Sequence, residues 1–540
     1  MDGERGTRRD ELLLALLAAA AAFTAFLYYY HRNVILLYGD AVAHINIARR
    51  IFDSITPGPL QIGTVWLPLP HLLMIPFLIS NWMWRTGVGG SIISMIACVA
   101  GTVGIYRLSI AVHSSGSWRN AGIVSAFIFA ANPNLLYLQA TAMTESLYLA
   151  LFVWAVVFAI EWLRARDAAT ASKNLERCAV TVAAAMLTRY DGWFLAACMI
   201  ANILAVRMVP GWNAMHDDLS VGAERLSRPA VLKFVLLLVA IAGVWFAYNY
   251  REFGNPSEFA TGPYSARAIE RRASDSYNQH HPGYHSPVVA AEYFLKSAKL
   301  NVGSGGWELP LTIFAAIGLL AAIVTRAYLP AILLSIPVPF YALSIAYGGV
   351  PIFLPIWWPF SYYNARYGLE LLPAISVFTG VAVATAFQYL ASRVLRLALL
   401  AAVLAIVIAS YLSVWRAVPI CLREAHANGD DRQKFEIALA HELQKLPRSS
   451  RLLMSTGEHP GALERAGFPL RQVINESNHP QWEQALAAPA RTADYIVTLD
   501  NDDVAQAVAA HPADLIPQVT VTMPGDPRTT IYKSLQRSAR

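Results

Sequence analysis

Charged residues are scarce in this chain of 540 residues: Asp, Glu, Lys and Arg make up 14% of it, whereas soluble domains carry roughly 25%. Hydrophobic residues account for 56%, and the mean hydropathy is +0.41. Because so little charge is available, most of the chain cannot be solvated by water. Apolar runs of about 20 residues recur, and this length crosses a hydrocarbon core about 30 Å thick. The sequence therefore predicts a polytopic helical membrane protein.

Cysteine and several familiar sequence signals are also scarce or missing. Three of the four cysteines lie in apolar segments, so no disulfide framework is implied. No G-x-G-x-x-G follows a strand-like run, so we expect no nucleotide site. The first apolar run, residues 12–30, is too long for a signal-peptide core and has no small-residue cleavage site after it. We expect this run to be retained as a membrane span.

The basic residues predict the orientation of the chain. The net charge is +6, and Lys and Arg cluster in short loops between apolar runs, which is typical of topology signals rather than of nucleic-acid binding. Arg5, Arg8 and Arg9 precede the first span, so we expect a cytoplasmic N-terminus in the cell (inner) membrane. The apolar runs then predict about eleven spans, an odd number, which places the C-terminal tail outside.

These spans divide the chain into two parts. Residues 1–418 are predicted to form an all-α polytopic membrane domain with long outer loops at 31–90 and 251–309. Residues 419–540 alternate amphipathic stretches with strand-like runs, which predicts a small α/β extracytoplasmic domain. The strand-like runs are 452–454, 495–499 and 519–521.

Ionisable residues at membrane depth are energetically costly and are usually functional. Four positions of this kind occur, of which three are predicted at the outer boundary. The other lies in residues 188–193, which separate two short apolar pieces and so predict a broken helical hairpin that is buried or lines a cavity and that could reach this boundary. The residues are Asp40 with His44, Glu145, Arg189 with Asp191, and Arg366.

Each of these residues also has a structural interpretation. Asp40 follows a glycine at a helix start and could be an ordinary N-cap, with His44 as a polar partner four residues later. Glu145 could cap the helix that begins beside it. The arginines could serve as an ion-pair partner or as an interfacial anchor. The local pattern leaves both interpretations open.

The second outer loop adds candidates for binding. Residues 253–267 combine turn formers and aromatic residues with Tyr264 and Arg267. Arginine pairs bidentately with phosphate and aromatic rings stack on sugars, so this stretch suits a lipid-linked sugar. His280, His281 and His285 lack the spacing to carboxylates of a metal site, which favours a solvated loop.

Several short motifs occur in a fixed order along the chain. They are Met143-Thr144-Glu145, the run Leu187-Thr188-Arg189-Tyr190-Asp191-Gly192-Trp193, Gly254-Asn255-Pro256 followed by Tyr264-Ser265-Ala266, and Arg366-Tyr367 with Leu372-Pro373. This layout, over roughly residues 10–415, resembles the GT-C superfamily of integral-membrane glycosyltransferases. Within it, the chain resembles the bacterial protein mannosyltransferase-like and lipid A aminoarabinose transferase-like enzymes.

The resemblance implies a polyprenyl-phosphate sugar donor and transfer on the outer membrane face. An acidic residue of the first outer loop acts as base in such enzymes and corresponds here to Asp40, while the acidic residue of the second corresponds to Glu145. Members often carry two adjacent acidic residues in the first loop, whereas Ala41 follows Asp40 here.

The resulting hypothesis is a hexosyltransferase-type glycosyltransferase that works by inverting single displacement. Asp40 would be the general base, assisted by Glu145, and an arginine would stabilise the departing lipid phosphate. The residues neither require a cofactor nor exclude a divalent metal, and they leave open whether the acceptor is a protein, a lipid or a glycan. The predicted substrate-binding residues are His44, Arg189, Tyr190, Asp191, Tyr264, Arg267, Arg366 and Tyr367.

Two other functions compete with transfer. A transporter or flippase of a lipid-linked sugar or anionic solute would use the break around Arg189 as a midplane site. However, the polar candidates gather at one face, and no second broken helix mirrors the first. A non-catalytic assembly protein, with the tail binding a partner, is the third reading.

Overall fold

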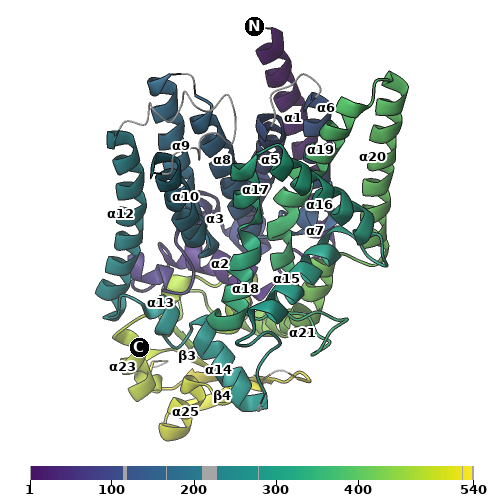
Figure 1. Cartoon of the computed structure of the whole chain (residues 1–540). Helices are drawn as coiled ribbons and strands as arrows, with labels where there is room; N and C mark the ends of the chain where they lie inside the picture. The colour runs from purple at the N-terminus through teal and green to yellow at the C-terminus, as the bar shows by residue number, and fades with distance from the viewer. Residues whose placement is uncertain are drawn as a thin grey trace.

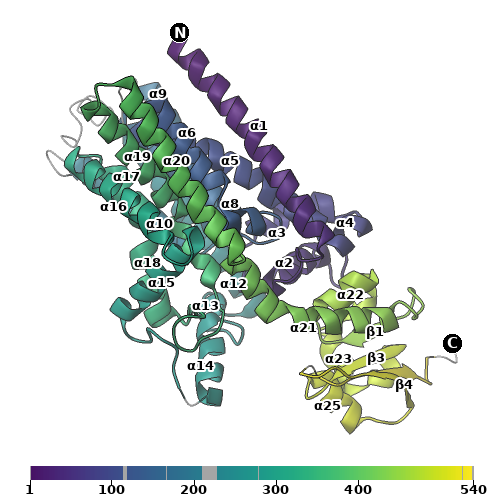
Figure 2. The same cartoon turned by 90° about the vertical axis from the view of Figure 1, so that its right-hand side faces the viewer.

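The computed structural model describes residues 2–112, 118–165, 167–208, 228–277, 279–525 and 527–537. Helices account for the regular structure as far as residue 443, and most of them stand roughly side by side in one bundle (Figure 1). The N-terminus lies at one end of this bundle, and a small sheet near the C-terminus lies at the other end (Figure 2).

Seven helical stretches among the described residues are long and apolar enough to cross a membrane, and four more apolar helices are shorter. The protein is therefore a multi-pass membrane protein, as its composition predicts. The seven are Gly6–His31 in α1 (Asp2–His31), α5 (Val88–Val112), α8 (Glu145–Leu163), Pro229–Phe253 in α12 (Arg228–Phe253), α17 (Tyr328–Ser335) with α18 (Pro337–Gly348), η3 (Ala365–Leu371) with α19 (Leu372–Tyr389), and α20 (Arg393–Arg416) with α21 (Ile420–Leu443). The shorter four are α3 (Leu69–Leu78), Arg119–Ala130 in α6 (Trp118–Ala130), Asp191–Ala205 in α10 (Asp191–Met208), and α16 (Glu308–Val324).

The predicted helical break lies between α9 (Ala168–Met186) and α10, but the prediction of two short pieces is wrong. α9 begins well before the apolar run, because Asp167 caps it by accepting a hydrogen bond from the Thr170 amide at 2.8 Å. The polar N-terminal turns of α9 then continue into the apolar ones. Two full helices joined by a tight turn replace the broken hairpin.

The two long loops that the sequence predicts to be outer, at 31–90 and 251–309, contain short helices. The first loop forms α2 and its neighbours, and the second folds into a separate group of helices, of which α13 and α14 lie toward the sheet end of the bundle (Figure 1). These short elements and the short α7 are α2 (Gly39–Arg50), η1 (Pro59–Ile62), α4 (Asn81–Thr86), α7 (Pro133–Leu138), α13 (Glu258–Thr261), α14 (Ala266–Tyr277) and α15 (Pro287–Val302).

The C-terminal region forms a mixed five-stranded sheet in the order β2-β1-β3-β5-β4. β1 pairs in parallel with β2 and β3, whereas β5 is antiparallel to both β3 and β4. The three predicted strand-like runs lie in β1, β3 and β4. The elements are β1 (Leu452–Met454), β2 (Val473–Ile474), β3 (Tyr495–Leu499), β4 (Leu515–Val521), β5 (Thr529–Ser534), α22 (Pro460–Ala466), η4 (Leu470–Gln472), α23 (Gln481–Ala487), α24 (Pro489–Thr492) and α25 (Asp503–Ala510).

α21 joins the two regions by turning away from α20 and crossing the sheet end of the bundle (Figure 2). It packs directly on the loop that precedes α2. A Cβ added at Gly429 would lie 2.1 Å from the Leu37 carbonyl oxygen, so only glycine permits this approach. Arg432 reinforces the contact, because its Nη2 donates to the Leu36 and Leu37 carbonyls at 2.9 and 3.0 Å. The start of α2 is thereby fixed in place.

Candidate functional site

Asp40 lies in the first turn of α2. The N-cap of this helix is Tyr38, in extended conformation, and no side chain caps the helix through a hydrogen bond. The interpretation of Asp40 as the N-cap is therefore wrong, although a carboxylate in the first turn is favoured by the helix dipole. Ala41 and Ile45 anchor the opposite face of α2 in the core. The Asp40 side chain remains 39% exposed.

Arg366, at the start of η3, connects three carboxylates from three other elements. Its Nη2 donates to Asp40 at 2.6 Å, its Nε to Glu145 at 3.0 Å, and its Nη1 to Glu424 of α21 at 2.8 Å. The guanidinium is 8% exposed and lies about equally close to the rings of Tyr38 and Tyr367, 5.1 Å from each centroid. Every nitrogen of this arginine thus holds an acidic group.

Arg189, in the turn between α9 and α10, forms a second centre beside the first. Its Nη1 lies 3.2 Å from the same Glu145 oxygen that Arg366 contacts, so Glu145 bridges the two arginines. Its Nε lies 3.3 Å from Asp191 and 3.8 Å from Glu370. Glu145 is the first residue of α8, but Thr144 is the N-cap, so the capping interpretation of Glu145 is wrong as well.

The cluster carries more acid than base. Five carboxylates surround two guanidiniums, which leaves three negative charges in excess if all are ionised. Glu370 is 1% exposed, and neither of its oxygens has a hydrogen-bond partner among the described residues. The carboxylates are Asp40, Glu145, Asp191, Glu370 and Glu424.

Glu370 and Glu424 are absent from the sequence prediction. Glu370 had a signal, because it is an acid at the start of a predicted apolar span. Glu424 had none, since it lies among many charged residues in an amphipathic helix. Only the packing of α21 on η3 brings its carboxylate to Arg366.

His44 pairs with a residue other than the one expected. Its ring is 2% exposed, and its Nδ1 lies 2.8 Å from Nε2 of His71 in α3. Burial lowers the pKa of His44 to about 4, against the opposing effect of the Asp40 and Glu145 charges. His44 is therefore neutral at pH 7. Its ring packs against that of Trp66, with 5.0 Å between the ring centroids.

The remaining predicted residues divide into two groups. Tyr367 belongs to the cluster, because its ring lies 5.0 Å from the Arg189 guanidinium carbon and 5.1 Å from that of Arg366. Tyr190 instead stacks on Phe259, at 5.2 Å between ring centroids. The side chains of Tyr264 and Arg267 are exposed on the second outer loop, and no hydrogen bond or ion pair among the described residues joins them to the cluster.

A metal set of three or more His, Cys, Asp or Glu side chains does not occur among the described residues. The carboxylates of the cluster face guanidinium groups rather than one another, and His280 lies 3.2 Å from Glu270 on the second outer loop.

No family model matches the chain, and no curated protein matches its sequence. Among solved structures, ArnT from Cupriavidus metallidurans bound to undecaprenyl phosphate matches with a TM-score of 0.54 and 13% identity, over 96% of this chain and 97% of that chain. The apo Archaeoglobus fulgidus oligosaccharyltransferase matches with a TM-score of 0.51 and 12% identity, over 91% of this chain and 69% of that chain.

The fold is therefore that of the GT-C membrane glycosyltransferases, over nearly the whole chain. The particular likeness is to ArnT, whose full length this chain nearly spans. At these identities the likeness is one of fold, and it confirms the resemblance inferred from the motifs.

Proposed function

We propose that this protein is a glycosyltransferase that moves a sugar from a polyprenyl-phosphate donor to an acceptor on the extracytoplasmic face, with Asp40 as general base. The observation that carries the proposal is that Asp40 is the most exposed member of the charged cluster. Asp40 is 39% exposed, whereas Arg189, the next most exposed member, is 13% exposed. A substrate entering the site would meet the Asp40 carboxylate first.

The fold supports the donor class. The structure of ArnT is described as bound to undecaprenyl phosphate, and a sugar attached through phosphate already carries its leaving group. In the proposed step the acceptor oxygen bonds to the anomeric carbon while the bond from that carbon to the phosphate oxygen breaks. The acceptor proton passes to Asp40, and the phosphate leaves with the electron pair, which inverts the anomeric centre.

Arg366 has a specific part in this proposal. In this structure Arg366 Nη2 donates to Oδ2 of Asp40 at 2.6 Å, so this oxygen is already engaged by the arginine. A donor phosphate that takes over this N–H group would be stabilised by Arg366 and would at the same time release Asp40. Arg189 and Glu145 would keep Arg366 oriented, since Glu145 bridges both arginines.

Replacement of Asp40 tests the proposal. Asp40→Asn keeps the shape and a hydrogen-bond acceptor for Arg366 but removes the base. We expect transfer to fall by about 10²–10⁴-fold. The assay follows release of undecaprenyl phosphate from a panel of undecaprenyl-phosphate-linked sugars by the purified full chain. Asp431→Asn is the matched control, because Asp431 is 78% exposed on α21 and, among the described residues, forms an ion pair with the neighbouring Lys434 alone.

Two results would count against the proposal. Full transfer by a well-folded Asp40→Asn variant would remove Asp40 from the chemistry. Movement of the lipid-linked sugar across the membrane of vesicles that contain the protein, without cleavage of the bond between sugar and phosphate, would favour the transporter instead.

A second part of the proposal concerns the topology of the chain in the membrane. We propose about eleven spans, a cytoplasmic N-terminus and an extracytoplasmic region from residue 419 onward. Arg8 and Arg9 before the first span support this orientation. The position of the sheet at the end of the bundle opposite the N-terminus also supports it (Figure 2). The boundary between residues 418 and 419 falls between the end of α20 and the start of α21.

A further inference from the structure

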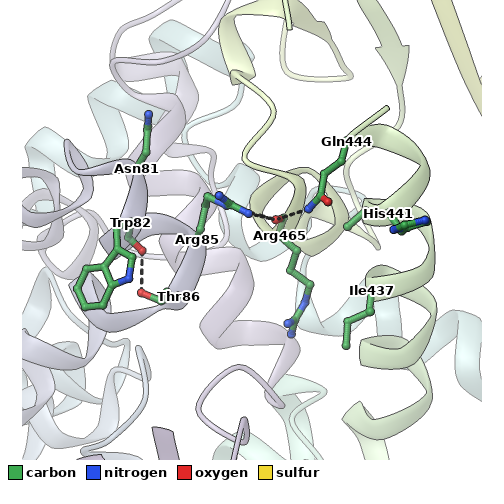
Figure 3. Close-up of a pocket in the computed structure, with 9 residues that line it drawn as sticks. Asn81, Trp82, Arg85, Thr86, Ile437, His441, Gln444 and Arg465 are labelled. Carbon is green, nitrogen blue, oxygen red and sulfur yellow. Dashed lines mark hydrogen bonds between the residues drawn. The ribbon is translucent and has the colours of Figure 1, made fainter. Parts of the chain in front are cut away.

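A pocket of about 580 Å³ opens between α4, α21 and α22, apart from the charged cluster (Figure 3). Its polar side-chain groups are two guanidiniums, an imidazole, two amides, a hydroxyl and an indole N–H, and no carboxylate is present among the described residues that line it. Such a lining favours an anion. The lining residues are Asn81, Trp82, Arg85, Thr86, Ile437, Ala440, His441, Gln444 and Arg465.

Arg85 and Arg465 both line the pocket and are joined through the Arg465 main chain. Arg85 reaches from α4 and donates to the Arg465 carbonyl through Nη2 at 3.1 Å and Nε at 3.3 Å (Figure 3). The Arg465 side chain is 18% exposed, and its Nε lies 3.8 Å from the buried Glu436. Nε and Nη2 of Arg465 are buried and have no hydrogen-bond partner among the described residues. A partly desolvated guanidinium beside a pocket whose described lining lacks carboxylates favours an anion there.

The pocket lies at the level of the membrane boundary. α4 is separated from the span α5 by Gly87 alone. Beside the pocket, Ile79 is 66% and Trp82 is 56% exposed, and Ile437 on the opposite wall is 51% exposed. Tryptophan is enriched where the headgroups of a bilayer meet its hydrocarbon. An anion bound here would have apolar surface next to it, as a phospholipid headgroup with its chains requires.

The pocket is also connected to the helix that carries Asp40. Trp84, next to Arg85, donates to Oδ1 of Asn46 at 3.2 Å. Glu464, next to Arg465, accepts from Nδ2 of the same Asn46 at 2.6 Å. Asn46 lies on α2. In each of the pairs Trp84-Arg85 and Glu464-Arg465, the first residue therefore contacts α2 and the second lines the pocket.

We propose that this pocket binds the phosphate headgroup of an anionic phospholipid, and that the bound lipid holds α4 and α22 together around Asn46. Arg85 would bind the phosphate, the positive charge of Arg465 in the pocket wall would add to its attraction, and the lipid chains would extend along Trp82 and Ile437. The ligand would act as a structural brace and is distinct from the donor, which the charged cluster would receive.

The test compares lipids on the purified full chain in detergent. Native mass spectrometry counts bound phosphatidylglycerol and phosphatidylcholine, and thermal unfolding gives the Tm with each. We expect preferential binding of phosphatidylglycerol and a higher Tm with it. Arg85→Gln or Arg465→Gln should each weaken that binding about fivefold, since one basic side chain near a lipid surface contributes about 1 kcal/mol. Arg416→Gln, an exposed arginine at the end of α20, is the matched control and should bind as wild type does.

A second variant guards against misfolding. His441→Glu places a carboxylate at an exposed position of the pocket and leaves both arginines in place, so it should also lose the preference for phosphatidylglycerol. Equal binding of the two lipids by wild type would overturn the proposal, as would an equal loss in Arg465→Gln and Arg416→Gln. A rise in Tm with inorganic phosphate as large as that with phosphatidylglycerol would identify a free-anion site and overturn the lipid assignment.

Discussion

At the scale of single residues, the charged cluster pairs both guanidiniums with carboxylates and contains more carboxylates than guanidiniums. Arg366 and Arg189 each contact three carboxylates, and they share Glu145. Buried ion pairs are costly to assemble, and loss of one partner exposes the full desolvation penalty of the other. The consequence of a substitution therefore depends on whether the residue is bonded to an arginine or only lies near one.

Glu145 and Glu370 provide a matched pair that tests this distinction. Glu145→Gln removes the charge that both arginines contact, and we expect the free energy of unfolding to fall by about 1.5–3 kcal/mol. Glu370→Gln removes a charge without a hydrogen bond from a site that has excess negative charge, so its Tm should equal or exceed that of wild type. Thermal unfolding of the full chain in detergent measures both. A larger loss in Glu370→Gln than in Glu145→Gln would contradict the pairing described here.

Glu464 adds a pH dependence to stability. Burial raises the pKa of Glu464 from 4.5 to about 8, with a smaller opposing effect of Arg465. In the folded protein this carboxyl keeps its proton up to that pH, whereas in the unfolded chain it ionises near 4.5. Its contribution to stability is therefore fully present below about pH 4.5 and is lost as the pH rises toward about 8.

The isosteric variant Glu464→Gln isolates this effect. Its amide oxygen can still accept from Asn46, but it does not titrate. We expect the Tm of wild type to fall more steeply than that of Glu464→Gln between about pH 5 and pH 8. Parallel pH profiles for the two proteins would show that Glu464 is ionised in the folded state.

At the scale of elements, the site depends on α21. Glu424 of this helix binds Arg366. In its first turn, the Cys421 carbonyl accepts a hydrogen bond from the Tyr38 hydroxyl at 2.8 Å. Arg432 of the same helix holds the Leu36 and Leu37 carbonyls. α21, which follows α20, thus orients the residues that precede Asp40 and the arginine that binds it.

Gly429→Ala tests the contribution of α21. The new Cβ would lie 2.1 Å from the Leu37 carbonyl oxygen, a backbone atom that no rotamer change can move. We expect a loss of about 1–3 kcal/mol in stability, with reduced transfer because the start of α2 shifts. Gly457→Ala is the control, since its Cβ would meet nothing closer than Glu476 at 3.8 Å. Equal Tm values for the two variants would remove the steric argument.

At the scale of the whole molecule, a bundle of membrane helices and a small sheet share one surface, at which α2, α4, α21 and α22 meet. Asp40 of α2 joins the ion-paired cluster, whereas Asn46 of the same helix is bonded to Glu464 of α22, next to the pocket residue Arg465. α2 therefore connects the charged cluster to the region of that pocket.

The proposed orientation can be measured with cysteines introduced at the two ends. Arg8→Cys lies before the first span, and Asp514→Cys lies in the tail, both at exposed positions. In spheroplasts, a membrane-impermeant maleimide should label Asp514→Cys at once and Arg8→Cys only after the membrane is permeabilised. The wild-type chain controls for its native cysteines, of which three are buried. The reverse labelling pattern would invert the topology.

The sequence by itself determined the membrane class and the strands at 452–454 and 495–499. Hydrophobic length and strand alternation are local properties that a short window records. It also indicated Asp40, Glu145, Arg189, Asp191 and Arg366, because an isolated charge in an apolar setting is conspicuous wherever the chain leads. The match to ArnT confirms the GT-C likeness of fold that the motifs predicted.

Only the tertiary structure decided which of these residues meet. Asp40 and Arg366 are far apart in the sequence yet lie 2.6 Å apart, and Glu424 joins them from a helix that looks like any amphipathic surface helix. Tyr264 and Arg267 were expected at the site but are exposed elsewhere. Ion pairing depends on distances between elements, which a sequence pattern does not contain, so the partners of each charge emerge only when the helices pack.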